Sequence, residues 1–281
     1  MEKGRHALYA FFGAVQAGCF YVPLNPVLPE ARLRQVLAVL EAPLIVTDRA
    51  HYPLAARLFP ESAVLLIEDL IQAPPAPAVL ACIQEDMTDT NPLYCLFTSG
   101  STGNPKGVMI RHRSICNLIA VLDPILSSID GGFLCTANSI FDIFTTETLI
   151  AMAYGKYSVM ADEEEMMLPW KVAELITKHR VGMIEFTPSR AQLFLNNHVF
   201  FEAIQSMPVA MMCGEVLPPQ LLQMLRDAKC QRIFNLYGPT EVTVYCTMDE
   251  VTHADRITVG RMYPNCRGYV LDEAMRPVMP T

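Results

Sequence analysis

The sequence predicts an α/β fold, with a doubly wound, mainly parallel sheet. Two observations predict it. Short apolar segments alternate along the chain with longer segments whose apolar residues recur at helical spacing. Strands joined by intervening helices form βαβ units, and successive units build a mainly parallel sheet with helices on both faces. The chain has 281 residues, of which 52% are hydrophobic and 18% charged, so it can bury the core that such a sheet requires.

The first 78 residues form a leading lobe in this prediction. An apolar helix ends at Gly18, and Pro29 opens a second helix with apolar residues three and four positions apart. Three prolines between residues 72 and 78 predict a loop, which separates residues 1–78 from residues 79–281. We expect helices at residues 7–17 and 30–40, and strands at residues 20–22, 44–47 and 63–67.

The alternation continues beyond this loop, without an internal repeat. We expect strands at residues 92–97, 108–110, 133–137, 158–160, 181–186, 209–213 and 232–235. Helices are expected between them at residues 114–126, 145–153, 170–179, 190–196 and 219–228.

Composition limits the classes of partner. The net charge of −8 argues against nucleic acid or an anionic membrane as the main partner. Nine cysteines, an odd number without a C-x-x-C pair, indicate reduced thiols in a cytoplasmic protein. Glycines and prolines interrupt the uncharged run between Arg5 and Glu30, so no segment there is long enough to span a bilayer.

Glycines and hydroxyl-bearing residues occupy six consecutive positions after a predicted strand, and a lysine follows three residues later. Glycines permit a tight turn whose N–H groups point inward, the hydroxyls donate hydrogen bonds, and the lysine adds a mobile positive charge. The pattern predicts a phosphate-binding loop, although its spacing is not that of a Walker A loop. The alternative is a flexible surface linker. The expected phosphate contacts are Thr98, Ser99, Gly100, Ser101, Thr102, Gly103 and Lys106.

A second motif, Phe234-Asn-Leu-Tyr-Gly-Pro-Thr-Glu241, follows another predicted strand. Its Gly-Pro pair forces a turn, and Thr240 suits a helix N-cap or a phosphate contact. Tyr237 offers a flat ring to a purine, and Glu241 offers a carboxylate to Mg²⁺, which prefers oxygen ligands. Taken alone, the motif is also compatible with an ordinary tight turn.

Together the two motifs resemble the phosphate loop and the adenine and metal motif of the adenylate-forming (AMP-binding) enzymes. This superfamily includes the adenylation domains of nonribosomal peptide synthetases, acyl- and aryl-CoA synthetases and luciferases. Weaker similarities at residues 14–26, 213–215, 259–261 and 269–273 extend the resemblance over residues 7–279. It implies a layered αβαβα core, ATP and Mg²⁺ as cofactors, Lys106, Thr240 and Glu241 in catalysis, and Glu241 on the metal. Further nucleotide contacts are implied for Gly214, Glu215, Asn235, Tyr237 and Gly238.

The sequence departs from the family pattern in several places. Cys213 stands where glycine is common, and Arg267-Gly268 replaces a polar–apolar pair. The family's later Thr-Gly-Asp motif, its hinge and its small C-terminal domain with a catalytic lysine have no counterpart before Thr281. We therefore expect a truncated N-terminal core that is poorly active alone.

The pair Phe141-Asp142 is similar to the peptide-synthetase branch, in which this aspartate binds the α-ammonium of an amino acid. Burial of such a carboxylate is costly without a cation. The alternative role for Asp142 is to cap the following helix. Glu185 interrupts an apolar strand, so it faces either a cationic substrate side chain, as in ornithine or lysine, or water or a buried donor. The implied pocket comprises Asp142, Ile143, Thr146, Glu185, Met211, Cys213, Leu236, Val244 and Tyr245.

The implied reaction converts ATP and an amino acid to an aminoacyl adenylate and pyrophosphate. A phosphopantetheine thiol on a partner carrier protein then takes the aminoacyl group, as in nonribosomal peptide synthesis. Two alternatives remain at this stage: the core of an acyl- or aryl-CoA ligase, and a non-catalytic nucleotide-binding remnant.

Overall fold

The computed structural model describes residues 1–40, 44–59, 63–99 and 104–278, except the side chain of Ser99. The chain divides into two compact units, which we describe separately. Unit 1 comprises Met1–Cys116 and Cys135–Leu168, and unit 2 comprises Asn117–Leu134 and Pro169–Thr281. The lobe boundary expected after residue 78 falls inside unit 1. No helix in the described part of the chain is long and apolar enough to cross a membrane.

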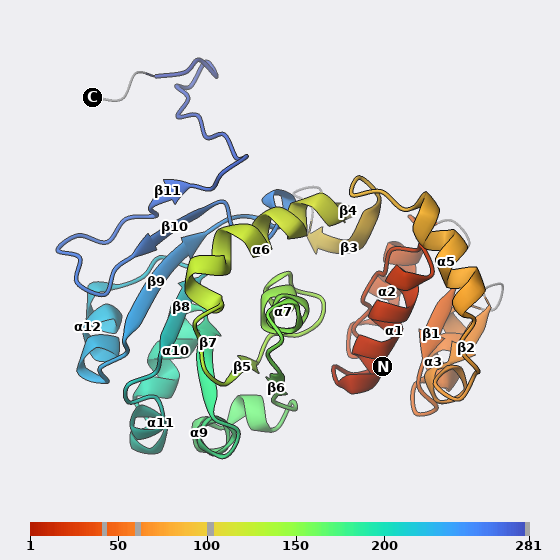
Figure 1. Cartoon of the computed structure of the whole chain (residues 1–281), viewed down its shortest axis with the longest axis horizontal. Coiled ribbons are helices and arrows are strands. Elements are labelled where there is room, and N and C mark those ends of the chain that lie inside the picture. The colour runs from red at the N-terminus through yellow and green to blue at the C-terminus, as the bar shows by residue number, and fades with distance from the viewer. Residues whose placement is uncertain (41–43, 60–62, 100–103, 279–281) are drawn as a thin grey trace. The chain divides into compact units, whose positions relative to one another are not determined.

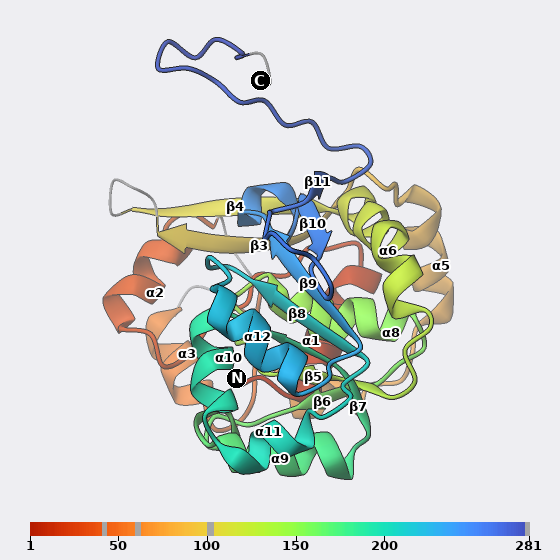
Figure 2. The same ribbon diagram turned by 90° about the vertical axis from the view of Figure 1, so that its left-hand side faces the viewer.

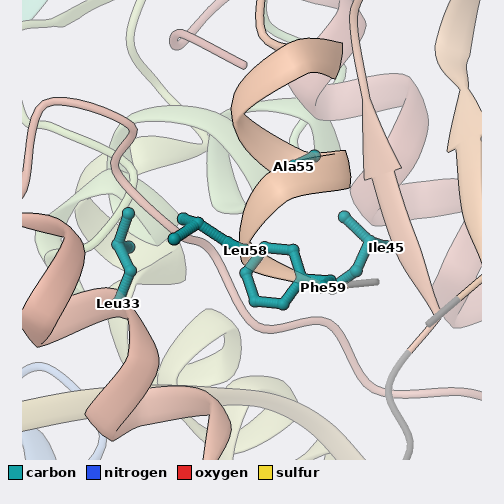
Figure 3. Packing of buried hydrophobic residues seen from close by; sticks show 5 residues of the cluster. All are labelled: Leu33, Ile45, Ala55, Leu58 and Phe59. Carbon is teal, nitrogen blue, oxygen red and sulfur yellow. The ribbon is translucent and has the colours of Figure 1, made fainter. Parts of the chain in front are cut away.

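The first half of unit 1 is a small α/β layer (Figure 1). Its two short strands pair in parallel, with Val46 opposite Leu65. Helices pack against them, and a buried apolar cluster fills the space between (Figure 3). The cluster consists of Leu33, Ile45, Ala55, Leu58 and Phe59. The elements are α1 (Arg5–Gln16), α2 (Glu30–Leu37), β1 (Ile45–Thr47), α3 (Tyr52–Leu58), β2 (Val64–Leu66), α4 (Ile67–Leu70) and α5 (Pro77–Asp86).

Unit 1 also contains a long antiparallel hairpin, made of β3 (Pro92–Ser99) and β4 (Pro105–Arg111) (Figure 2). Tyr21 forms an isolated parallel bridge to Tyr94 beside it. The remaining elements of this unit are α7 (Ile143–Thr145), the π-helical turn η1 (Thr146–Ile150), α8 (Ala151–Ala153), β6 (Ser158–Met160) and the 3-10 turn η2 (Glu165–Met167).

Unit 2 contains most of the main sheet, whose full strand order is β11-β10-β9-β8-β7-β5-β6. Strands β5, β7, β8 and β9 pair in parallel, while β10 and β11 are antiparallel. Helices α10 and α12 cover one face of the parallel strands, and α6 lies across the other (Figures 1 and 2). The elements are α6 (His112–Leu126, which enters this unit at Asn117), β5 (Gly132–Cys135), α9 (Pro169–Lys178), β7 (Val181–Phe186), α10 (Pro188–Leu195), α11 (His198–Ala203), β8 (Val209–Cys213), α12 (Pro219–Asp227), β9 (Arg232–Tyr237), the 3-10 turn η3 (Thr240–Val242), β10 (Thr247–Glu250) and β11 (Arg261–Met262).

The α/β class and the mainly parallel sheet agree with the sequence prediction, as do β6, β7 and β8 to the residue. Several elements differ from it. Helices α3 and α4 were not expected, and the strand expected at residues 20–22 is only an isolated bridge at Tyr21. Two further helices differ as well. Pro77 begins α5, although the three nearby prolines predicted a loop over residues 72–78, because a proline is tolerated in the first turn of a helix. The six-residue helix α11 was not expected. Its N-terminus is capped by Asn197, whose side chain accepts a hydrogen bond from Phe200 N.

Candidate functional site

The predicted site residues of unit 2 gather at the carboxyl ends of three neighbouring parallel strands. The register places Glu185 beside Met211, Met212 beside Asn235, and Cys213 beside Leu236. Each strand end therefore presents its residues to the same edge of the sheet. In open α/β sheets this edge is where ligands bind.

The segment from Tyr237 to Cys246 folds back on itself directly after β9. Cys246 N donates to the carbonyl of Tyr237 at 2.8 Å, and the Cys246 thiol approaches the same oxygen at 3.5 Å. Gly238 fits inside this return, since a Cβ at that position would lie 2.5 Å from the Cα of Tyr245. No side chain larger than hydrogen fits there, which explains the glycine of the motif.

Two residues of this segment adopt the left-handed conformation. Thr243 has φ 69° and Val244 has φ 66°. Positive φ is a genuine outlier for a β-branched residue, and such strain persists only where the surrounding structure enforces it. The result is that Val244 and Tyr245, both almost fully buried, return to lie against Gly238, directly after β9. No pattern in the sequence predicted this strained turn.

Burial separates the motif residues into two groups. Asn235 and Leu236 are buried, and the side-chain amide of Asn235 donates to the carbonyl of Thr258 at 2.7 Å. Tyr237 is 55% exposed, so its ring is accessible to a flat ligand. Glu241 is exposed on η3, and Thr240 is half-buried beside it. The side chains of Tyr237 and Glu241 are therefore exposed, whereas Asn235 and Leu236, directly before them in the motif, are buried.

Glu185 and Cys213 are in direct contact within unit 2. Both are 2% exposed, and the Cys213 thiol donates to Glu185 Oε1 at 3.4 Å. Tyr263 also lies near this carboxylate: burial raises the pKa of its phenol, and the negative charge of Glu185 raises it further. Sequence reasoning missed Tyr263, because it lies far along the chain and outside every motif.

Gly214 and Glu215 follow β8. Gly214 has φ 80°, a conformation that favours glycine. The carboxylate of Glu215 accepts hydrogen bonds from the Ser189 N–H at 2.8 Å and from the Ser189 hydroxyl. Ser189 lies in the first turn of α10, where a negative charge is favoured by the helix dipole. The side chain of Glu215 thus stabilises the N-terminus of α10. This role is separate from the backbone contact with the nucleotide that the resemblance implies.

The predicted site residues of unit 1 lie on two structures. Thr98 pairs with Lys106 near the tip of the β3–β4 hairpin, and the Lys106 side chain is exposed. Ser99 pairs with Pro105. The rest of the expected phosphate loop, Gly100, Ser101, Thr102 and Gly103, lies outside the described residues.

Asp142 occupies the N-cap position of α7, but its side chain makes no capping hydrogen bond. Ile143 begins that helix and is half-buried, and Thr146 begins η1 and is fully buried. Asp142 and Thr146 are therefore one helical turn apart on the same short segment.

The donor set of Glu241 fits magnesium, because an exposed carboxylate oxygen suits a hard cation that takes its other ligands from phosphates and water. Within the described ranges, no group of three or more His, Cys, Asp or Glu side chains is placed to hold a metal.

Comparison with known proteins agrees with this arrangement. The AMP-binding enzyme family model matches residues 1–281. Linear gramicidin synthase of Brevibacillus parabrevis contains a polypeptide that is 31% identical over 283 residues, which span 99% of this chain and 5% of that polypeptide. This chain is thus similar to a small part of a much longer relative.

Two solved structures are similar as well. One is holo-AB3403, a four-domain nonribosomal peptide synthetase bound to AMP and glycine, with a TM-score of 0.84 and 27% identity over 99% of this chain and 20% of that one. The other is the N-terminal subdomain of Klebsiella oxytoca NpsA in complex with 3-hydroxyanthranilyl-AMSN, with a TM-score of 0.79 and 23% identity. It covers 99% of this chain and 69% of that one. The second likeness shows a shared fold.

Proposed function

Because this chain belongs to the AMP-binding enzyme family, we propose that it binds ATP and an α-amino acid and forms the aminoacyl adenylate. The segment from Tyr237 to Cys246 carries the proposal. It presents the exposed ring of Tyr237 and the exposed carboxylate of Glu241 at the edge of a parallel sheet where ligands bind in this class of fold. The buried residues Thr243 and Val244 of the same segment adopt the strained left-handed conformation. The similarity to gramicidin synthase and to a peptide synthetase bound to AMP and glycine supports the same assignment.

In the proposed reaction, a carboxylate oxygen of the amino acid attacks the α-phosphorus of ATP. The bond from that phosphorus to the bridging oxygen breaks, and pyrophosphate leaves. Tyr237 stacks on the adenine, while Thr240 donates a hydrogen bond to a phosphate. Lys106 and the hydroxyl of Thr98 bind the departing pyrophosphate. These groups act by positioning and by charge stabilisation. Magnesium held by Glu241 neutralises phosphate charge when it is bound.

Asp142 and Glu185 define the proposed substrate class. Asp142 is assigned to the α-ammonium by the resemblance of Phe141-Asp142 to the peptide-synthetase branch, and its side chain makes no capping hydrogen bond to α7. Glu185 is a buried acid at the end of β7, and a cationic side chain of the substrate offsets the cost of its burial. We therefore propose a diamino acid such as ornithine or lysine. The other proposed substrate residues are Met211, Cys213, Leu236, Val244 and Tyr245 in unit 2, and Ile143 and Thr146 in unit 1.

The product is then proposed to pass, in the cytoplasm, to the phosphopantetheine thiol of a carrier protein. The thiolate attacks the carbonyl carbon of the adenylate, the thioester forms, and AMP leaves. In this proposal the present chain supplies the nucleotide and amino acid sites.

Calorimetry with the purified chain tests the proposal. The ligands are AMP and non-hydrolysable sulfamoyl-adenosine analogues carrying ornithine, lysine, leucine or a benzoyl group. We expect AMP to bind and the diamino acid analogues to bind more tightly. Tyr237→Ala should weaken every ligand, and Asp142→Asn should weaken only the aminoacyl analogues.

Other outcomes would contradict the proposal. Tightest binding of the benzoyl analogue would indicate an aryl-CoA ligase, and binding of AMP with no gain from any acyl group would indicate a nucleotide-binding remnant. A full-length synthetase that contains this chain should then show pyrophosphate exchange that depends on the same amino acid.

A further inference from the structure

Glu147 is a buried carboxylate that the proposed reaction does not use. It lies in the π-helical turn η1 of unit 1 and is 0% exposed. Its Oε1 accepts the N–H of Thr136 at 3.2 Å, and its Oε2 accepts the N–H of Ala137 at 2.9 Å. These two N–H groups directly follow the end of β5. One side chain thus satisfies two consecutive backbone donors eleven and ten residues earlier in the chain.

Two further groups face Glu147. The thiol of Cys135 hydrogen-bonds to its carboxylate, and the ammonium of Lys3 lies close enough to interact with its charge. Lys3 Nζ also donates to the carbonyls of Cys135 and Ala137, each at 3.3 Å. Burial raises the pKa of Glu147 from 4.5 to about 7, although all these neighbours oppose the rise. The carboxylate is therefore held in place by an N-terminal segment, a strand end and its own helix.

The hydrogen bonds of Glu147 close a loop that runs from Thr136 to Glu147, and Asp142 lies in the middle of it. The far side of the loop is held as well. Thr145 N donates to the carbonyl of Asp142 at 2.8 Å, and the Thr145 hydroxyl hydrogen-bonds to the buried phenol of Tyr21. Asp142 thus sits between two anchors, one of which is Glu147.

We infer that Glu147 is a positioning residue for substrate binding: by closing the loop of residues 136–147, it sets the place of the Asp142 carboxylate that takes the substrate ammonium. The inference rests on the proposed function of Asp142. Glu147 does not contact the substrate in this assignment. Its effect should therefore appear in aminoacyl recognition and not in recognition of the nucleotide.

Glu147→Gln tests the inference with little change of volume. Its single amide oxygen can accept only one of the two N–H groups, and its NH₂ group faces the other. At pH 8, we expect the variant to bind the preferred aminoacyl sulfamoyl-adenosine about tenfold more weakly, because a shift of the order of 1 Å in a binding group has effects of this size or larger. Affinity for AMP alone should stay within about twofold of wild type, a change too small to mark a lost contact.

Glu165→Gln is the matched control. Glu165 belongs to the same unit, and its carboxylate likewise accepts a backbone N–H, that of Asp162 at 2.8 Å, but it is outside the loop that carries Asp142. This variant should bind both ligands as wild type does. Equal losses for both ligands in Glu147→Gln, or no loss for either, would overturn the inference.

A measurement on the wild-type chain is independent of ligand binding and of the folding of any variant. Amide resonances of Thr136, Ala137 and Asp142 should shift together between pH 6 and 8, as Glu147 gains its charge. Asp142 resonances that stay constant while those of Thr136 and Ala137 move would overturn the positioning role. If wild-type protein binds no aminoacyl analogue but the three resonances move together, the proposed function fails and the coupling of Glu147 to Asp142 survives.

Discussion

Unit 1 and unit 2 each bury a glutamate, and the two carboxylates are held by different kinds of group. Glu147 in unit 1 is 0% exposed and accepts two backbone N–H groups. Glu185 in unit 2 is 2% exposed, accepts the thiol of Cys213, and lies near the phenol of Tyr263. The first carboxylate accepts two main-chain N–H groups besides the Cys135 thiol, whereas the second contacts the side chain of Cys213 on the neighbouring strand and lies near Tyr263, which follows β11.

This difference separates an indirect role, in which Glu147 holds the loop that carries Asp142, from the direct substrate contact proposed for Glu185. Backbone donors are present whatever the neighbouring residues are, so a carboxylate that binds them stabilises a chain path. Side-chain neighbours such as Cys213 and Tyr263 depend on residue identity, so the environment of Glu185 changes with each substitution around it. We therefore expect mutations of Glu147 to affect stability most, and those of Glu185 to affect choice of substrate.

The largest expected effect is on stability. Glu147→Leu should lower the free energy of unfolding by roughly 2–6 kcal/mol, because a buried N–H group and a partly buried one lose their acceptor at about 1–3 kcal/mol each. Glu185→Leu should cost less, because replacing a buried charge by an apolar side chain of similar size is often nearly neutral. Urea unfolding of both variants measures the difference. Equal losses would erase the distinction between the two glutamates.

The titration of Glu147 should also make the stability of the protein depend on pH. The pKa of Glu147 rises from 4.5 in the unfolded chain to about 7 in the folded one. The folded state thus binds this proton more tightly than the unfolded state does. The contribution of the proton to the free energy of unfolding is complete below pH 4.5 and is lost as the pH rises to 7. Relative to Glu147→Gln, wild type should lose roughly 3 kcal/mol over this window. Urea unfolding at several pH values tests this, and a difference that does not change with pH would refute it.

Gly238→Ala should disrupt the tight turn between Tyr237 and Cys246, which contains Glu241. The added Cβ would lie 2.5 Å from a backbone atom of Tyr245, and overpacking of this kind costs about 1–3 kcal/mol. AMP affinity should fall together with the melting temperature. Gly13→Ala is the control, since nothing lies within 4 Å of its Cβ and alanine is favoured within α1. A Gly238→Ala protein as stable as this control would contradict the close packing.

Glu185→Gln should change the substrate profile with little change of stability. A charged hydrogen bond to a diamino acid contributes about 1.5–3 kcal/mol, so its preference over leucine should fall roughly ten- to hundredfold. AMP affinity should be unchanged, because the exposed Tyr237 and Glu241 are untouched. Competition between ornithine and leucine analogues measures the preference. An unaltered profile would remove Glu185 from recognition, and the family assignment would stand.

The smallest effect is expected for Glu215→Gln. Its carboxylate accepts the Ser189 N–H in the first turn of α10, and the loss of its charge at a solvent-exposed helix end costs about 0.5 kcal/mol. Affinity for AMP should stay at the wild-type value. A marked loss of AMP binding would show that this side chain, and not only the neighbouring backbone, contacts the nucleotide.

Much of the fold follows from local sequence. The apolar runs of β7 and β8 determined their own bounds, because every residue of both strands is buried and turn residues flank them. The hydroxyl- and glycine-rich loop and the motif ending at Glu241 were enough to indicate the family. These signals depend on the order of neighbouring residues, and the chain presents that order before it folds.

The tertiary structure decided which distant groups meet. Strand register brought Glu185 and Cys213 into contact, although 28 residues separate them. Close packing around Gly238 imposed the left-handed turn at Thr243 and Val244, which no local propensity favours. The pairing of Glu147 with Thr136 and Ala137 exists only once η1 lies against the residues that follow β5. Such contacts escape sequence reasoning, because burial and hydrogen bonding between distant segments are properties of the folded chain.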